Sequence, residues 1–253
     1  MKNISVQIAK TWVAVSALIM VSVPEAQAAP LIVNGGFESG FTGWSRVDQV
    51  GGDGTLSIQS GTSSPSNGDV VPAPTKGANA AMSDAQGPGA HVLYQDFTAV
   101  AGVTFLSFDL FIGNRGFIPD FASPDTLDFS IAGFNQQVRV DIIDVLADPF
   151  SVGVGDVLQS IYQSQSGDPL ISGYTNISAD IAALMLAHSG QTLRLRFAET
   201  DNLGPLQMGV DDIQSGSGSG NPVPEPSSAL LVGAGLALMA SRRTRGPGHR
   251  HST

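Results

Sequence analysis

The sequence predicts an all-β domain in which antiparallel sheets pack face to face, with one short helix. Four segments alternate apolar and polar residues, and a period of two is typical of strands with one buried and one solvent-facing side. Glycine is abundant, at 30 of 253 residues, and serine and aspartate are frequent, which favours short strands joined by many turns. Repeated within one domain, such strands indicate a two-sheet sandwich.

The alternating segments are expected to supply the core. Their apolar positions are Leu106, Phe108, Leu110 and Ile112; Leu127, Phe129 and Ile131; Val138, Val140 and Ile142; and Leu193, Leu195 and Phe197. The residues between these positions are predicted to face solvent, and they include Asp128, Arg139, Asp141, Arg194 and Arg196.

One segment, residues 178–188, has the period of a helix. Its apolar stripe consists of Ile181, Leu184, Met185 and His188, with Ser178 as N-cap, Asp180 in the first turn and Gly190 beyond the last turn. This helix is expected to lie over one end of the sandwich, with His188 as a packed or helix-end residue.

The connections are rich in glycine, serine and proline. Residues 51–88 are predicted to be long exposed loops with one or two short strands, and residues 113–124 are predicted to be another loop, which carries Phe117 and Phe121. Residues 215–221 are mainly alternating serine and glycine, which predicts a flexible linker after a domain at 30–214.

Residues 1–29 have the three parts of a secretory signal peptide. Lys2 and Lys10 precede an apolar stretch at 12–23, and Ala26-Gln27-Ala28 provides the small residues of a cleavage site. The pattern predicts export through the general secretion machinery. A buried helix of the folded domain is the alternative.

The C-terminus combines a proline-glutamate-proline motif, an apolar run at 229–240 and a basic cluster. An apolar helix of about 12 to 15 residues would be about 18 to 23 Å long, which is short of a hydrocarbon core about 30 Å thick. Such a segment favours temporary retention in a membrane, with its arginines on the cytoplasmic side. A disordered or core-packed tail is the alternative.

The order of these features over residues 222–245 resembles the PEP-CTERM sorting signal of Gram-negative bacteria. The matching residues are Pro224, Glu225, Pro226, Arg242 and Arg243. The resemblance implies recognition by an exosortase, transient association with the inner membrane, and release or attachment at the surface of a cell that makes exopolysaccharide or biofilm. Residues 246–253 extend beyond the signal as a tail, whose His249 and His251 are not expected to bind metal.

Between the two terminal signals the chain is strongly acidic. Residues 30–221 contain 20 Asp and Glu against 6 Lys and Arg, a net charge of −14, compared with −10 for the whole chain. Such a surface repels phosphate backbones, so no nucleic-acid partner is expected. It suits an extracellular protein or one that binds divalent cations. The absence of cysteine excludes disulfides and thiol catalysis.

Both ends of the domain resemble galactose-binding-like jelly-roll domains, which include many carbohydrate-binding modules. The matching segments are Asn34-Gly35-Gly36-Phe37-Glu38 with Gly43-Trp44, and Gly209-Val210-Asp211-Asp212-Ile213. The resemblance implies a jelly-roll β-sandwich whose first strand pairs beside its last, and weak binding of extracellular polysaccharide. It also implies a structural Ca²⁺ ion held by Glu38 and Asp211, with Asp212 as the substitute. In the alternative, these carboxylates are edge groups bonded to backbone.

Aromatic residues are the candidates for sugar contacts. Trp44 is expected to pack in the core. Phe117, Phe121, Tyr162 and Tyr174 are better candidates for a ligand surface, although their spacing singles out none of them.

Catalytic signatures are absent from the sequence, which has no nucleophile elbow, zinc-binding helix or phosphate loop. His91 and His188 are the histidines of the domain, and neither lies in a catalytic motif. Asp109 and Asp128 could form a glycosidase pair, which needs carboxyl groups roughly 5 to 10 Å apart. The sequence favours a non-enzymatic matrix protein; a purely structural matrix protein and a secreted hydrolase are the alternatives.

Overall fold

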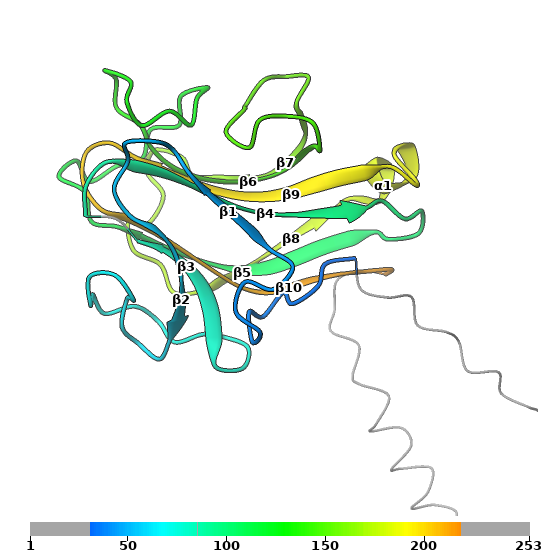
Figure 1. Cartoon of the computed structure of the whole chain (residues 1–253), viewed down its shortest axis with the longest axis horizontal. Helices are drawn as coiled ribbons and strands as arrows, with labels where there is room; N and C mark the ends of the chain where they lie inside the picture. Colours follow the sequence, from blue (N-terminus) through cyan, green and yellow to red (C-terminus); the bar gives the residue numbers. More distant parts are fainter. Residues whose placement is uncertain (1–30, 85, 219–253) are drawn as a thin grey trace, which may run out of the picture.

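Two five-stranded antiparallel sheets, stacked face to face, make up the computed structural model (Figure 1), which describes residues 31–84 and 86–218. In order across the first sheet, the strands are β1 (Ser45–Asp48), β4 (Gly89–Thr98), β9 (Thr192–Asp201), β6 (Gln136–Asp144) and β7 (Val157–Gln163). In the second they are β2 (Thr55–Ser60), β3 (Asn79–Asp84), β10 (Leu206–Gly216), β5 (Phe105–Asn114) and β8 (Thr175–Asp180), after which comes α1 (Ala182–Ala187). The predicted all-β sandwich with one short helix is confirmed.

Neighbouring strands in each sheet come from distant parts of the sequence. The chain crosses between the sheets repeatedly, and only β2–β3 and β6–β7 are consecutive strands of one sheet, so both layers contain early and late strands. The two short strands β2 and β3 lie inside the predicted loop region 51–88, as expected. The predicted signal peptide and sorting signal lie outside the described residues.

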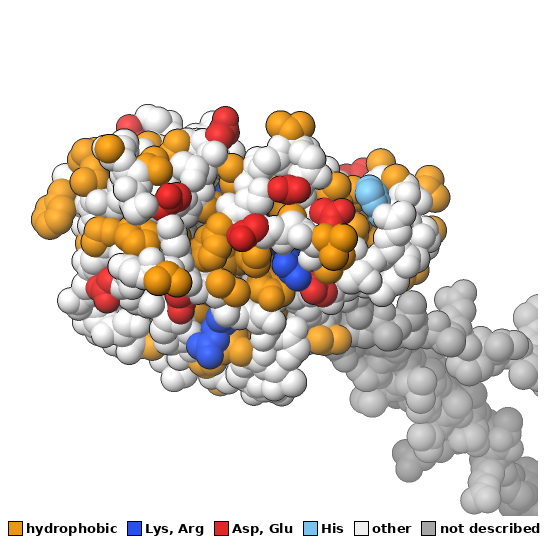
Figure 2. Space-filling view, turned by 45° about the horizontal axis from the view of Figure 1, so that its top comes forward, with side chains coloured by type: hydrophobic (Ala, Val, Ile, Leu, Met, Phe, Trp, Pro, Cys, Tyr) orange, Lys and Arg blue, Asp and Glu red, His pale blue; other side chains and the backbone are white. Residues whose placement is uncertain are grey.

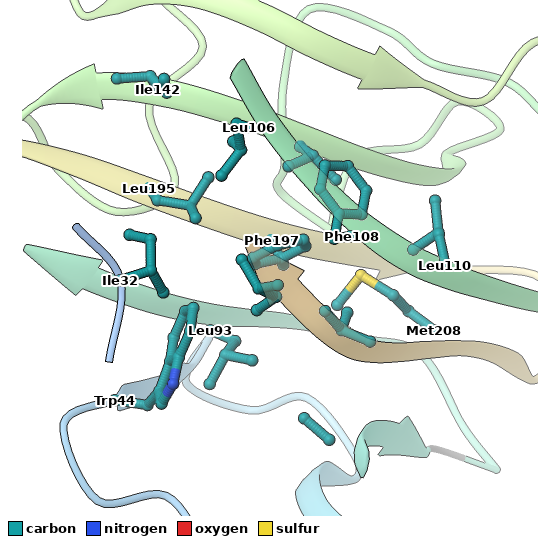
Figure 3. Packing of buried hydrophobic residues seen from close by; sticks show 14 of the residues in the cluster. Ile32, Trp44, Leu93, Leu106, Phe108, Leu110, Ile142, Leu195, Phe197 and Met208 are labelled. Atoms are coloured by element: carbon teal, nitrogen blue, oxygen red, sulfur yellow. The ribbon is translucent and has the colours of Figure 1, made fainter. Parts of the chain in front are cut away.

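The core fills the space between the sheets with the side chains that the alternating pattern predicted. Phe108 of β5 and Phe197 of β9 meet edge to face, with ring centroids 5.1 Å apart (Figure 3). Trp44 is also a core residue, as predicted: it packs against Phe37, and its indole N–H donates to the carbonyl of Asn34. Burial of one large apolar side chain contributes about 1.5–3 kcal/mol, so this layer stabilises the domain without disulfides.

The predicted strand at 127–131 is wrong, because these residues form turns. The carboxylate of Asp128 accepts hydrogen bonds from the backbone N–H of Ser130 and from the side chain of Gln49. Such local side-chain bonds offer the backbone an alternative to strand pairing. Leu127 is still buried, but it packs on the outside of the first sheet.

The predicted helix is too long at its N-terminal end. Ser178 lies in β8, opposite Ser107 of β5, and α1 begins only at Ala182. Asp180 is the last residue of β8, and its carboxylate accepts the backbone N–H of Ala182, so Asp180 lies before the helix instead of in its first turn. Pairing with the open edge of β5 satisfies backbone groups that a helix would have used internally. Within the described residues, no helix has the length and apolarity to cross a membrane.

The outer side of the first sheet differs from the prediction, because loops cover it. Residues 145–156, here called the cover loop, pack Phe150 and Val152 against Val92 and Ala198 of the sheet. Figure 2 shows this side of the molecule, with apolar side chains gathered in its middle and acidic ones scattered around them. The polar residues of β6 and β9 beneath the loops are therefore buried; Arg196 is 0% exposed.

Both ends of the described chain leave the sandwich at the same end (Figure 1). Near its start, the carbonyl of Gly35 accepts the backbone N–H of Ile213 in β10. Near its finish, Gly218 exchanges two hydrogen bonds with the hydroxyl of Thr104, directly before β5. β10 itself continues to Gly216, two residues past the predicted domain boundary at 214.

Candidate functional site

The carboxylates of Glu38 and Asp211, the predicted metal ligands, both bind the segment at 75–79 that leads into β3. Glu38 Oε1 accepts the backbone N–H groups of Ala78 and Asn79, each at 2.8 Å. Gly77, directly before Ala78, is required here because its φ is +75° and a Cβ on it would lie 2.5 Å from Glu38 Oε1. The sequence resemblance therefore brought together two residues that do converge on one segment.

Asp211 holds the beginning of the same segment. Its Oδ2 accepts the backbone N–H of Thr75 at 2.7 Å and of Lys76 at 2.8 Å, as well as the Thr75 hydroxyl. Its Oδ1 accepts the backbone N–H of Asp212. Burial raises the pKa of Asp211 above its ordinary value, and these hydrogen bonds oppose that rise.

This arrangement does not fit the predicted calcium site. Ca²⁺ is bound by six to eight oxygen ligands, whereas N–H donors surround the Asp211 carboxylate and one oxygen of Glu38. Asp212 bonds Gln214 instead, at a bulge where its own φ is +46°. Among the described residues, no three His, Asp or Glu side chains are grouped so that they could hold a metal ion. The geometry favours the alternative, in which the carboxylates fasten backbone amides.

The structure separates the four candidate aromatic residues. Phe121 is 2% exposed and belongs to the main core, and Tyr162 packs against the same core. Tyr174 lies on the outer side of the second sheet against Phe111, with its hydroxyl bonded to Gln59, and burial raises its pKa. Phe117 differs from these three, because it is 90% exposed.

The loop that carries Phe117 is held firmly in place. The backbone N–H groups of Arg115 and Phe117 donate to the carbonyls of Pro205 and Leu203, in the turn before β10. The side chain of Asn114 closes the loop by donating to the carbonyl of Asp120 at 2.7 Å. Fixed backbone keeps the ring at the surface although its burial would be favourable. This is a preorganised apolar contact point.

Gly204 supports the Phe117 loop at close range. A Cβ on Gly204 would lie 2.9 Å from Gly116 Cα, 3.2 Å from the Phe117 nitrogen and 3.4 Å from its ring carbon Cδ2. Gly204 also has a φ of +118°, which other residues rarely adopt. Sequence reasoning named Phe117 but missed Gly204 and Arg115, because their roles depend on two loops that only the fold brings together.

Arg115, two residues before Phe117, links this loop to polar groups of two other segments. Arg115 donates to Gln207 Oε1 and to the carbonyl of Val70, and its Nε lies 3.1 Å from Asp69 Oδ2. Val70 is 82% exposed and Ile118 is 42% exposed. The residues Asp69, Val70, Arg115, Phe117 and Ile118 are here called the Phe117 surface. It combines exposed apolar side chains with hydrogen-bonding groups.

The catalytic candidates lie apart from one another. Asp109 is on β5 in the second sheet, bonded to Asn176, whereas Asp128 lies in the loop over the first sheet. The glycosidase pair is therefore not brought together. His91 is buried between Asp48 and the carbonyl of Asp53, and His188 bonds Gln191 at the end of α1. Among the described residues, neither histidine is hydrogen-bonded to a serine, threonine or lysine side chain.

No family model matches this chain, and no curated protein matches it. Solved structures of similar architecture include TmCBM61 in complex with beta-1,4-galactotriose, at 14% identity and a TM-score of 0.44, covering 76% of this chain and 100% of the other. A cleaved adhesin domain of Lys-gingipain from Porphyromonas gingivalis has 12% identity and a TM-score of 0.46, with coverages of 75% and 100%. A family 11 carbohydrate-binding module from Clostridium thermocellum has 13% identity and a TM-score of 0.36, with coverages of 71% and 92%.

Proposed function

We propose that this protein is an exported, non-enzymatic component of an extracellular polysaccharide matrix that binds glycan weakly through the Phe117 surface. The observation that carries the proposal is the 90% exposure of Phe117 on a loop whose backbone is fixed by hydrogen bonds. The apolar face of a sugar ring packs on such an aromatic face, and Arg115 and Asp69 at its border can bond hydroxyl groups.

The expected affinity is low. Covering one phenylalanine ring contributes about 1.5–3 kcal/mol, whereas even a millimolar Kd corresponds to about 4 kcal/mol. A single aromatic contact with a few hydrogen bonds therefore supports binding near the millimolar range. Many copies along one polymer raise the overall strength of attachment, which suits a matrix protein better than a receptor for a soluble sugar.

The binding proposal is tested by electrophoresis of the purified protein through gels that contain neutral polysaccharides. Phe117→Ala is expected to weaken retardation at least about 10-fold, as a loss of about 1.5 kcal/mol requires. The matched control is Leu146→Ala in the cover loop, because Leu146 is 92% exposed but lies away from the Phe117 surface. Equal retardation of Phe117→Ala and the unchanged protein would contradict this role.

Export and sorting form the second part of the proposal. The support comes from the sequence of residues 1–29 and of 222–245, with Pro224, Glu225 and Pro226 as the recognition motif and the arginines Arg242 and Arg243 after the apolar run. In a bacterium with an exosortase, mass spectrometry of the extracellular protein should find a new N-terminus near Pro30 and a C-terminus near Pro224. Glu225→Ala should leave the full C-terminus attached to the inner membrane.

Two other functions predict different results. A purely structural matrix protein would be exported and processed but would bind none of the polysaccharides in the gels. A secreted hydrolase would release reducing ends from at least one of them, and that activity would survive Phe117→Ala only if its site lies elsewhere.

A further inference from the structure

The strands β5 and β10 run from one end of the sandwich to the other. One end carries the Phe117 surface, and the other end is where the described chain leaves. β5 begins directly after Thr104, which bonds Gly218. It ends directly before Arg115, two residues before Phe117. β10 runs the other way, from the turn that supports Phe117 to Gly216. A 10-residue strand is about 33 Å long. The Phe117 surface therefore lies about one strand length from the point where the C-terminal segment leaves.

The connection between the two ends is stiff. β5 and β10 are paired from Leu206 opposite Asn114 to Gly216 opposite Phe105, with one bulge between Asp211 and Gln214. Each has a further strand on its other side, β8 beside β5 and β3 beside β10. Interior strands of a packed sheet do not bend independently, so the distance between the ends is constant.

The charges near the Phe117 surface select the kind of glycan. Asp69 forms an ion pair with Arg115. Asp120, in the same loop as Phe117, accepts hydrogen bonds from the Ser166 hydroxyl and from the backbone N–H groups of Phe121 and Gly167. These bonds lower the pKa of Asp120 and keep it ionised. The domain as a whole carries a large negative charge, with 20 acidic against 6 basic residues over 30–221. A uronate- or sulfate-bearing polymer would be repelled, whereas an uncharged one would not.

We infer that the sandwich is an oriented spacer, which holds the Phe117 surface away from the site where its C-terminal segment is attached and presents it to an uncharged polysaccharide. The inference rests on the proposed function. It accounts for the placement of the Phe117 loop and the last described residues at opposite ends of β5 and β10. Attachment at one end leaves the other free to reach a polymer outside.

The test immobilises the full chain, made in a host without an exosortase, through single introduced cysteines, since the sequence has none. The first variant is Leu186→Cys on α1, where Leu186 is 69% exposed. α1 lies at the end of the sandwich where the chain leaves, because the backbone N–H of Ile181, directly before it, donates to the carbonyl of Thr104. The second variant is Val70→Cys, where Val70 is 82% exposed and belongs to the Phe117 surface. Each immobilised variant is exposed to a neutral polysaccharide and to a uronate polysaccharide of similar length.

Retention of the neutral polymer is expected to be at least 10-fold greater through Leu186→Cys than through Val70→Cys, with no retention of the uronate polymer by either. Equal retention in both orientations would overturn the spacer, and preferential retention of the uronate polymer would overturn the choice of glycan. If neither variant retains any polymer, and the protein in solution also binds none, the proposed function has failed and not merely the orientation.

Discussion

Arg196 and Asp141 form an ion pair in which both side chains are 0% exposed, on the outer side of the first sheet. The second amino group of Arg196 donates to the carbonyls of Pro149 and Ser151, so the same guanidinium holds the cover loop against the sheet. Arg139, two residues before Asp141 on β6, donates to both oxygens of its carboxylate. One carboxylate is thus shared by two buried cations.

The loss of Asp141 should therefore destabilise the domain severely. Asp141→Ala leaves Arg139 and Arg196 without their acceptor, and breaking a buried pair in this way costs about 3–5 kcal/mol. The free energy of unfolding from urea titration measures the effect. The control is Asp96→Ala, which breaks the pair with Arg194 at a carboxylate that is 38% exposed; such a pair contributes about 1 kcal/mol or less. Similar losses in both variants would contradict this account.

Asp201 predicts a pH dependence of stability. Its carboxylate is 0% exposed, Oδ1 accepts the backbone N–H of Gly89, and burial raises its pKa to about 7. Within the described structure, neither Asp201 Oδ2 nor Oε1 of Gln136, the residue opposite it on β6, has a hydrogen-bond partner. A proton on Asp201 would make its carboxyl group a hydrogen-bond donor at the strand position opposite Gln136.

The direction follows from the raised pKa. Because the folded value of about 7 lies above the ordinary 3.8, the stabilising contribution is complete below about pH 4 and is lost as the pH rises through 7. At about 1.4 kcal/mol per pKa unit, the loss is on the order of 4 kcal/mol. Asp201→Asn should remove this slope from urea titrations at pH 5, 6, 7 and 8; a slope unchanged by the substitution would refute the assignment.

The fastening of residues 75–79 by Glu38 and Asp211 predicts a large effect of Asp211→Ala. The substitution removes the buried acceptor of the Thr75 and Lys76 N–H groups, and each lost hydrogen bond is expected to cost about 0.5–1.5 kcal/mol. Thermal unfolding should show a lower Tm. Asp212→Asn is the matched control, because asparagine also tolerates a φ of +46° and keeps an oxygen that can accept from Gln214 across the bulge, and it should change the Tm little.

Chelation distinguishes this fastening from a calcium site. Since backbone N–H groups occupy the Asp211 carboxylate, a chelator should leave the Tm of the purified protein unchanged, and added Ca²⁺ should not raise it. A fall in Tm with chelator that Ca²⁺ reverses, and that Asp211→Ala abolishes, would show instead that the carboxylates rearrange around a cation.

Gly204→Ala should disturb the Phe117 surface, because Gly204 lies in the neighbouring turn that contacts the Phe117 loop. The new methyl group would meet Gly116 Cα and the Phe117 nitrogen, and the φ of +118° at position 204 is strained for alanine. Together the contact and the strain are expected to lower the free energy of unfolding by about 1–3 kcal/mol. Polysaccharide retardation should fall with it. Gly102→Ala is the control, with a φ of +98° but nothing within 4 Å of the added atom. It should lower stability alone; equal loss of binding in both variants would show a general unfolding effect.

Several features were predictable because they depend on short-range pattern. The alternation through Phe108 and Phe197 identified the core sides of β5 and β9, since a strand necessarily places successive side chains on opposite faces. The same rule failed at Leu127, where the apolar spacing was correct but the Asp128 carboxylate bonded its own backbone. The helix boundary failed at Ser178, because β5 offered an open edge that no local pattern reveals.

Short-range pattern in the sequence determined the two-sheet architecture, because alternation and turn residues act over a few positions, and the resemblance at the two ends of the domain implied the inward position of Trp44 and the convergence of Glu38 and Asp211. Only the tertiary structure decided which polar residues are buried and which aromatic is exposed. Arg196 alternates like a solvent-facing residue, yet the cover loop removes it from water, and Phe121 and Phe117 share one loop but differ from 2% to 90% in exposure. Exposure depends on what the rest of the chain places above each side chain, and that information is not contained in local spacing.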